Sequence, residues 1–164
     1  MNDGLGKEAE QKIREWLDRP QDGYSFDRLY DQLSGYYMTS RNICDFICYK
    51  HPNIYYIESK ATWKDSFPFS MIQPHQKEGL LKKSKIKGCY GLVIVLFASW
   101  RRAFVLDIRD IIDLESKGQK SLNIKKIKNW PIRYKEIQTI PNNRKKLLDY
   151  IGEIEDVVLE SEDV

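Results

Sequence analysis

The feature that most constrains the fold is a nearly continuous run of apolar residues from Tyr90 to Phe97. Continuous rather than alternating hydrophobicity is typical of a β-strand that is covered on both of its faces. A strand of this kind needs other elements packed above and below it. The run therefore predicts a central strand in a layered domain.

The flanking patterns predict the other elements of that domain. Residues 6–18 predict an amphipathic helix, because Ala9, Ile13, Trp16 and Leu17 recur at helical spacing. The stretch from Tyr24 to Tyr37 is ambiguous between a short helix and a loop. We expect further helices at Ser70–Lys85, Asp110–Ser116 and Asn143–Ile154, strands at Ala103–Ile108 and Pro131–Ile140, and a basic loop at Lys117–Lys128.

The order of these elements predicts an α/β fold with a mixed central β-sheet flanked by helices. A chain of 164 residues with 41% hydrophobic and 12% aromatic residues is suited to one compact domain and is not typical of a disordered protein. We expect this domain to span residues 1–154. The acidic segment 155–164 is predicted to be a flexible tail.

The cellular compartment is predicted from what the sequence lacks. No apolar run approaches the roughly 18 residues that span a bilayer, so we expect no membrane segment. The first residues show no signal peptide. The cysteines, Cys44, Cys48 and Cys89, cannot all pair with one another and lack the spacing of zinc ligands. We therefore expect reduced thiols and a cytoplasmic location.

The charges are distributed unevenly along the chain, although the net charge is only +3. Residues 81–147 contain 17 Lys and Arg but 5 Asp and Glu. Such a segment suggests a polyanionic partner such as DNA, although lysine-rich surfaces are often only solvated. If the sheet brings its turns to one side, the residues that would contact DNA phosphates are Lys82, Lys83, Lys85, Lys87, Arg101, Arg102, Lys120, Lys125 and Lys126.

Two carboxylates are predicted to face each other across a β-hairpin. The runs Ile43–Tyr49 and Ile54–Lys60 read as antiparallel strands joined by a short turn at residues 50–53. If Tyr49 opposes Ile54, then Asp45 lies directly opposite Glu58. Opposed side chains have Cβ atoms about 5 Å apart, and like charges at that distance repel. We expect a cation to hold the two carboxylates together.

The residue two positions after Glu58 adds a positive charge to the same face. Alternation along a strand places Lys60 beside Glu58. Two carboxylates are suitable ligands for Mg²⁺, and a nearby lysine can stabilise charge on a phosphate or position the attacking water. The three residues could therefore hydrolyse a phosphodiester. The alternative is that Glu58 and Lys60 only belong to a solvated face of the sheet.

The spacing of these residues resembles a known motif. Asp45 followed, after a gap of 12 residues, by Glu58-Ser59-Lys60 is similar to the PD-(D/E)xK motif of nucleases with a restriction-endonuclease-like fold. The segments Ser66-Phe67-Pro68-Phe69, His75-Gln76 and Gly118–Leu122 resemble motifs of the RecU-type Holliday junction resolvases. Gly6 and Glu10 resemble the first-helix motif that RecU shares with archaeal resolvases.

The resemblance implies a role for each matching residue. Asp45, Glu58 and Gln76 would hold Mg²⁺ or Mn²⁺, Lys60 would stabilise charge, and Glu10 would be a catalytic acid near the metal. Gln76 could also be an ordinary exposed helix residue, and either Glu10 or Glu8 could face the site. We expect His75 to have a supporting role rather than a catalytic one.

The function implied is a Mg²⁺-dependent, structure-selective DNA endonuclease that resolves Holliday junctions, acting as a homodimer on four-way or branched DNA. The chain departs from the family in having only residues 19–42 where RecU has a long stalk, and Ile43 where RecU has a threonine. A PD-(D/E)xK repair or restriction nuclease without junction selectivity is therefore the alternative. A DNA-binding module without catalysis is the third possibility.

Overall fold

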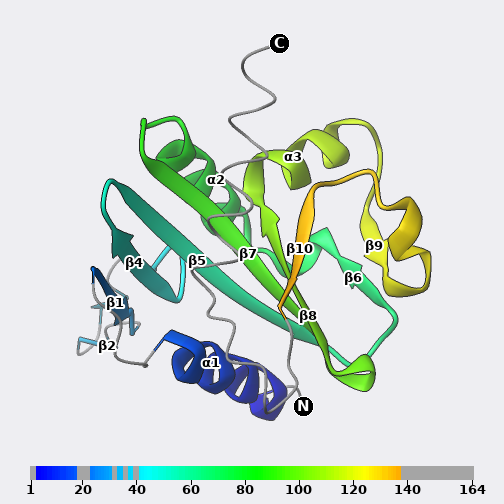
Figure 1. The fold of residues 1–164 in the computed structure, drawn as a ribbon, viewed down its shortest axis with the longest axis horizontal. Coiled ribbons are helices and arrows are strands. Elements are labelled where there is room, and N and C mark those ends of the chain that lie inside the picture. Colours follow the sequence, from blue (N-terminus) through cyan, green and yellow to red (C-terminus); the bar gives the residue numbers. More distant parts are fainter. Residues whose placement is uncertain (1–2, 18–22, 31–32, 35–36, 39–40, 138–164) are drawn as a thin grey trace.

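The computed structural model describes residues 3–17, 23–30, 33–34, 37–38 and 41–137. The main feature is a six-stranded sheet in the order β1-β4-β5-β7-β8-β10 (Figure 1). Its strands are β1 (Tyr24–Arg28), β4 (Phe46–Lys50), β5 (Asn53–Thr62), β7 (Cys89–Phe97), β8 (Arg102–Asp107) and β10 (Tyr134–Ile137). Strands β5 and β7 are parallel, and the other neighbouring pairs are antiparallel. The expected α/β class with a mixed central sheet is confirmed.

Helices cover both faces of the sheet. Helix α1 (Asp3–Leu17) packs on one face, and α2 (Pro74–Ser84) and α3 (Ile108–Ser116) pack on the other. Two short ribbons complete the fold, one of β2 (Leu33–Ser34) with β3 (Tyr37–Met38), the other of β6 (Ser66–Pro68) with β9 (Ser121–Asn123). Short 3-10 turns are η1 (Phe69–Met71), η2 (Ala98–Trp100) and η3 (Ile124–Asn129).

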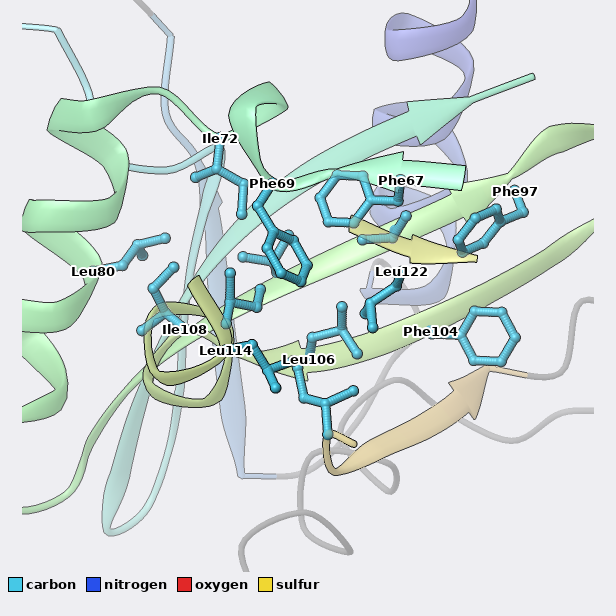
Figure 2. Packing of buried hydrophobic residues seen from close by; sticks show 14 of the residues in the cluster. Phe67, Phe69, Ile72, Leu80, Phe97, Phe104, Leu106, Ile108, Leu114 and Leu122 are labelled. Atoms are coloured by element: carbon cyan, nitrogen blue, oxygen red, sulfur yellow. The ribbon is translucent and has the colours of Figure 1, made fainter. Parts of the chain in front are cut away.

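Strand β7 separates the two halves of the hydrophobic core. Successive side chains of a strand point to opposite faces, so an entirely apolar strand contributes to both layers. Figure 2 shows the layer beneath α2 and α3, in which Phe67, Phe69 and Phe104 are buried. On β7, the layers divide strictly: Leu92, Ile94 and Leu96 pack on the α1 side, and Val93, Val95 and Phe97 on the α2 side. The predicted central strand is confirmed.

Two predictions about local structure are wrong. The segment that begins at Tyr24 forms strand β1 rather than a helix or loop, because it pairs with β4 along the register Tyr24↔Lys50 to Arg28↔Phe46. Residues 117–128 are not a plain loop, because Ser121–Asn123 pairs with β6 and is followed by η3. Both elements depend on partner strands that are distant in sequence.

Other boundaries differ by a few residues. The helix expected from Ser70 begins at Pro74, since proline lacks an N–H and is accepted in the first turn, whereas Phe69–Met71 forms a separate 3-10 turn. The strand expected at 131–140 is observed as Tyr134–Ile137. The predicted helix at 143–154 and the acidic tail lie outside the described residues.

Cys44, Cys48 and Cys89 are all free cysteines in the structure, and their reduced state stays a prediction. Cys44 and Cys48 are buried, and Cys89 is half-buried. Among the described residues, no helix combines the length and the apolar character that crossing a bilayer requires.

Candidate active site

The hairpin of β4 and β5 has the predicted register. Tyr49 pairs with Ile54, and Phe46 pairs with Ile57. Asp45 immediately precedes β4, and its N–H donates to the carbonyl of Ile57 at 3.0 Å. Because Ile57 pairs with Phe46, the regular ladder ends at Phe46. Asp45 and Glu58 nevertheless lie close enough for their charges to interact, as the sequence predicts.

Glu58 is a buried carboxylate with one oxygen bonded and one oxygen unpaired. The residue is 3% exposed. Its Oε1 atom accepts hydrogen bonds from Lys60 Nζ at 2.7 Å and from Gln76 Nε2 at 2.8 Å. Its Oε2 atom is buried and has no hydrogen-bond partner. A buried polar atom without a partner is costly, and its presence at a candidate site indicates a missing ligand.

Asp45 is held mainly by the backbone. Its Oδ2 atom accepts a hydrogen bond from the Ser59 N–H at 2.8 Å. Its Oδ1 atom lies 3.4 Å from Arg28 Nη1, a distance typical of a loose ion pair. The backbone bond fixes the orientation of the carboxylate and leaves Oδ1 able to take a further partner.

The pKa values of both carboxyl groups are raised. Burial raises the pKa of Glu58 to about 7, the charge of Asp45 adds to this effect, and Lys60 and Gln76 oppose it. Burial also raises the pKa of Asp45, against the hydrogen bond from Ser59. The two anions are therefore unfavourable together, and a bound cation would relieve their repulsion.

The donors fit a hard divalent cation. Two close carboxylates, one with an unpaired oxygen, match the one or two acidic ligands with which proteins hold Mg²⁺ while it keeps several waters. Among the described residues, no group of three or more His, Cys, Asp or Glu could hold a metal. Burial raises the pKa of the nearby Cys44 to about 12, so this residue stays a thiol and is a poor ligand.

A polar cleft of about 350 Å³ opens onto the two carboxylates. Arg28, Arg41 and His75 contribute to its lining together with Asp45, Glu58 and Gln76. Its lining residues come from the hairpin, the start of α2 and the end of β1. His75 thus lines the site, as its predicted supporting role requires.

Gln76 is oriented by the start of helix α2. The backbone N–H of Gln73 donates to Gln76 Oε1 at 3.0 Å as part of a capping box. The other end of the same amide donates to Glu58. Helix α2 packs closely against Ile43, which precedes the hairpin. This close approach needs a glycine at position 79, because a Cβ there would overlap the side chain of Ile43. The amide oxygen is therefore engaged by the helix start, and the nitrogen faces the carboxylate.

Arg28 is a site residue that sequence analysis missed. Its Nη2 atom pairs with Glu10 Oε2 at 2.6 Å, and its Nη1 atom donates to the main-chain carbonyl of Asp45 at 3.0 Å. This ion pair shows that Glu10 is the acid of α1 that approaches the site, because Glu8 instead pairs with Lys12 at 3.2 Å. The signal available in the sequence was the alternation of Tyr24, Phe26 and Arg28 on one strand face.

The predicted DNA-binding residues fall into two groups along β7. Lys82 and Lys83 lie in the last turn of α2, followed by Lys85 and Lys87 before β7. Arg101 and Arg102 follow the other end of β7, whose nine residues span about 30 Å. Lys125 belongs to this second group, since its Nζ pairs with Asp65 Oδ2 at 2.6 Å and Asp65 Oδ1 bonds to Trp100. These residues therefore lie toward both ends of β7, and their contact with DNA stays a prediction.

The second group is partly neutralised. Arg102 forms a two-pronged ion pair with Glu136, with Nε–Oε1 and Nη2–Oε2 distances of 2.6 and 2.7 Å. Lys120 and Lys126 are exposed. In the first group, Lys83 Nζ lies 5.1 Å from the centre of the Tyr56 ring.

Comparison with known proteins identifies a family and solved structures of similar fold. The sequence model of the family described as "RecU: Recombination protein U" matches residues 24–157. A solved structure of Hjc, a Holliday junction resolvase from the archaeal hyperthermophile Archaeoglobus fulgidus, is similar with a TM-score of 0.46 and 15% sequence identity. The match covers 63% of this chain and 78% of that chain. No curated protein sequence matches.

Proposed function

The chain belongs to the RecU family, and from that premise we propose that it is a metal-dependent DNA endonuclease that resolves Holliday junctions during recombination. The observation that carries the proposal is the buried Glu58 carboxylate, with an unpaired oxygen, beside Asp45 and in contact with Lys60. This arrangement has the charges that phosphodiester hydrolysis requires. The family match thereby confirms the resemblance seen in the sequence.

Asp45 and Glu58 are the proposed ligands for Mg²⁺, with Mn²⁺ as a substitute. When bound, such an ion supplies Lewis-acid stabilisation of a phosphate oxygen and activates water. Lys60 is held by Glu58 at 2.7 Å and is 16% exposed in its side chain. Its role is to place one positive charge where negative charge develops on the phosphate.

Gln76 and Arg28 position the two carboxylates. Because the Gln76 nitrogen faces Glu58 and its oxygen is engaged by Gln73, we assign Gln76 to orienting Glu58 instead of to metal coordination. Arg28 holds the Asp45 main chain and is itself held by Glu10. Residues that hydrogen-bond to metal-binding side chains set the orientation and basicity of those side chains.

The cleft has the charge pattern of a phosphate site. Its carboxylates lie beside the guanidinium groups of Arg28 and Arg41, and Arg41 is exposed. Arginine binds phosphate well because its planar fork matches the oxygens. Symmetric cutting of two strands needs two such sites, so we propose that the chain acts as a homodimer with C2 symmetry on branched DNA in the cytoplasm.

The test is cleavage of a labelled four-way junction and of linear duplex of the same sequence, each with Mg²⁺ or with EDTA. Glu58→Gln is the test variant, and Glu78→Gln on the exposed face of α2 is the matched control. We expect paired nicks across the junction only with metal, which are lost in Glu58→Gln and retained in Glu78→Gln.

The other outcomes separate the alternatives. Equal cutting of junction and duplex would retain the metal site but refute junction selectivity, leaving a repair or restriction-type nuclease. Tight binding of both DNAs without metal-dependent cutting would refute the nuclease proposal and favour a binding module.

A further inference from the structure

Three segments that are distant in sequence meet at the end of the sheet beyond β5. They are the turn after β5 at residues 63–65, the turn between β7 and β8 at residues 98–101, and η3 at residues 124–129 (Figure 1). We name this surface the tryptophan corner. It contains Trp63, Trp100 and several lysines, and the site described above does not use it.

The two tryptophans of the corner are exposed. Trp63 is 58% exposed and Trp100 is 40% exposed. The other two tryptophans, Trp16 and Trp130, pack against the hydrophobic core. Much of each of these large aromatic surfaces stays in contact with water, and exposed aromatic residues on neighbouring turns indicate an interaction site.

Hydrogen bonds hold the corner in place without any ligand. Trp100 Nε1–H donates to Asp65 Oδ1 at 2.7 Å, and the other oxygen of Asp65 pairs with Lys125. The hydroxyl of Ser99 donates to the Trp63 carbonyl at 2.6 Å. These bonds tie the three segments together. A preorganised surface loses little conformational freedom when it binds.

The corner is strongly basic. Asp65 is its one carboxylate, and that group is already paired with Lys125. Arg101 adopts a left-handed conformation with φ of 50°, which a glycine would take without strain. The chain nevertheless has an arginine there, next to Trp100. The exposed cations of the corner are Lys64, Arg101, Lys125, Lys126 and Lys128.

We propose that the tryptophan corner binds unpaired DNA bases, which stack on Trp63 and Trp100 while the cations contact the neighbouring phosphates. Aromatic faces combined with a basic surface are the usual means of binding single-stranded nucleic acid. A second copy of the chain is disfavoured as the occupant, because two basic corners would repel each other. The choice of DNA as the polyanion rests on the proposed function.

The position of the corner relates it to the cleft. Trp63 follows Glu58 by five residues along an extended strand, which corresponds to about 16 Å. A strand of DNA that enters the cleft can therefore also reach the corner. A four-way junction can be fully paired, so the corner would favour branched DNA that has single-stranded segments or bases that open at the branch point.

The test measures binding of a labelled oligo(dT) in EDTA, where no cleavage takes place. The variants are Trp63→Leu, Trp100→Leu and the double variant, since leucine keeps apolar surface but cannot stack. An abasic oligonucleotide of equal length has the same phosphates without bases. Tyr49→Leu, an exposed aromatic at the opposite end of the hairpin, is the matched control.

We expect each tryptophan substitution to weaken oligo(dT) binding about tenfold, and Tyr49→Leu to have no effect. Binding of the abasic strand should be equal for wild type and variants. Trp63→Leu removes no side-chain hydrogen bond seen in the structure, so this variant keeps the test valid if Trp100→Leu loses folding. Equal binding of oligo(dT) by wild type and Trp63→Leu would overturn the inference.

The result is separable from the fate of the proposed function. If the wild type cuts junctions but the tryptophan variants bind oligo(dT) normally, only the tryptophan corner assignment fails. If the variants lose oligo(dT) binding and no DNA is cut, the corner stands and the nuclease proposal fails. If the variants change the molecular mass in solution and not DNA binding, the corner is a contact between copies and the inference is refuted.

Discussion

Burial of Glu58 should make the stability of the metal-free protein depend on pH. The pKa of this group rises from 4.5 to about 7, first through burial and then through the charge of Asp45. Because the pKa is higher in the folded state, the unfolded chain releases this proton first as the pH rises. The contribution of Glu58 to stability is complete below pH 4.5 and is lost as the pH rises through 7.

The difference in pKa sets the magnitude of the effect. Each pH unit between the unfolded and folded values corresponds to about 1.4 kcal/mol, so the full effect is about 3 kcal/mol. Glu58→Gln cannot ionise and removes this dependence. We therefore expect the unfolding free energy of the wild type, relative to Glu58→Gln, to fall by about 2 to 3 kcal/mol between about pH 5 and pH 8.

The assay is urea denaturation in EDTA at several pH values across this range. Glu78→Gln, which changes an exposed glutamate on α2 in the same way, should follow the wild type. Parallel pH profiles for the wild type and Glu58→Gln would refute the reasoning, because they would mean that Glu58 ionises in the folded protein as it does in water.

The remaining predictions concern the metal, the arginine bridge and the packing of α2. At about pH 8, saturating Mg²⁺ should raise the urea midpoint of the wild type but not of Glu58→Gln, and an equal rise in both would place the ion elsewhere. Arg28→Lys should lower the cleavage rate about 10- to 100-fold, because lysine cannot hold Glu10 and Asp45 together. The control Arg133→Lys breaks a similar ion pair with Asp110 and should retain the cleavage rate. Gly91→Ala should lower the free energy of unfolding, measured by urea denaturation, by about 1 to 3 kcal/mol, because its Cβ would lie 2.6 Å from the Leu80 carbonyl oxygen. In the control Gly4→Ala the new Cβ meets no neighbour, so the free energy of unfolding should not fall.

Local patterns were sufficient for the parts of the fold that depend on neighbouring residues. The apolar run at 90–97 predicted the central strand, and the short turn after Tyr49 predicted the hairpin register. The register in turn placed Asp45 beside Glu58. These predictions succeed because alternation and turn length act over a few residues, within the reach of sequence analysis.

Elements at the edges were harder to predict. Strand β1 is only partly buried and is formed by its pairing with β4, about 20 residues later in the chain. Strand β9 likewise forms because β6 is available beside it. A short polar segment has little preference of its own, so the partner strand decides its structure.

The residues of the candidate site likewise fall into those that the sequence placed and those that only the tertiary structure placed. The sequence alone placed Asp45, Glu58 and Lys60 together, because they belong to one hairpin. Only the tertiary structure brought Arg28 to Asp45 and selected Glu10 over Glu8 as its partner, and only the start of α2 turned the nitrogen of Gln76 toward Glu58. It also separated the lysines after α2 from Arg101 by the length of β7. Charge and periodicity are properties of the sequence, but contacts between distant segments depend on how the whole sheet is ordered and packed.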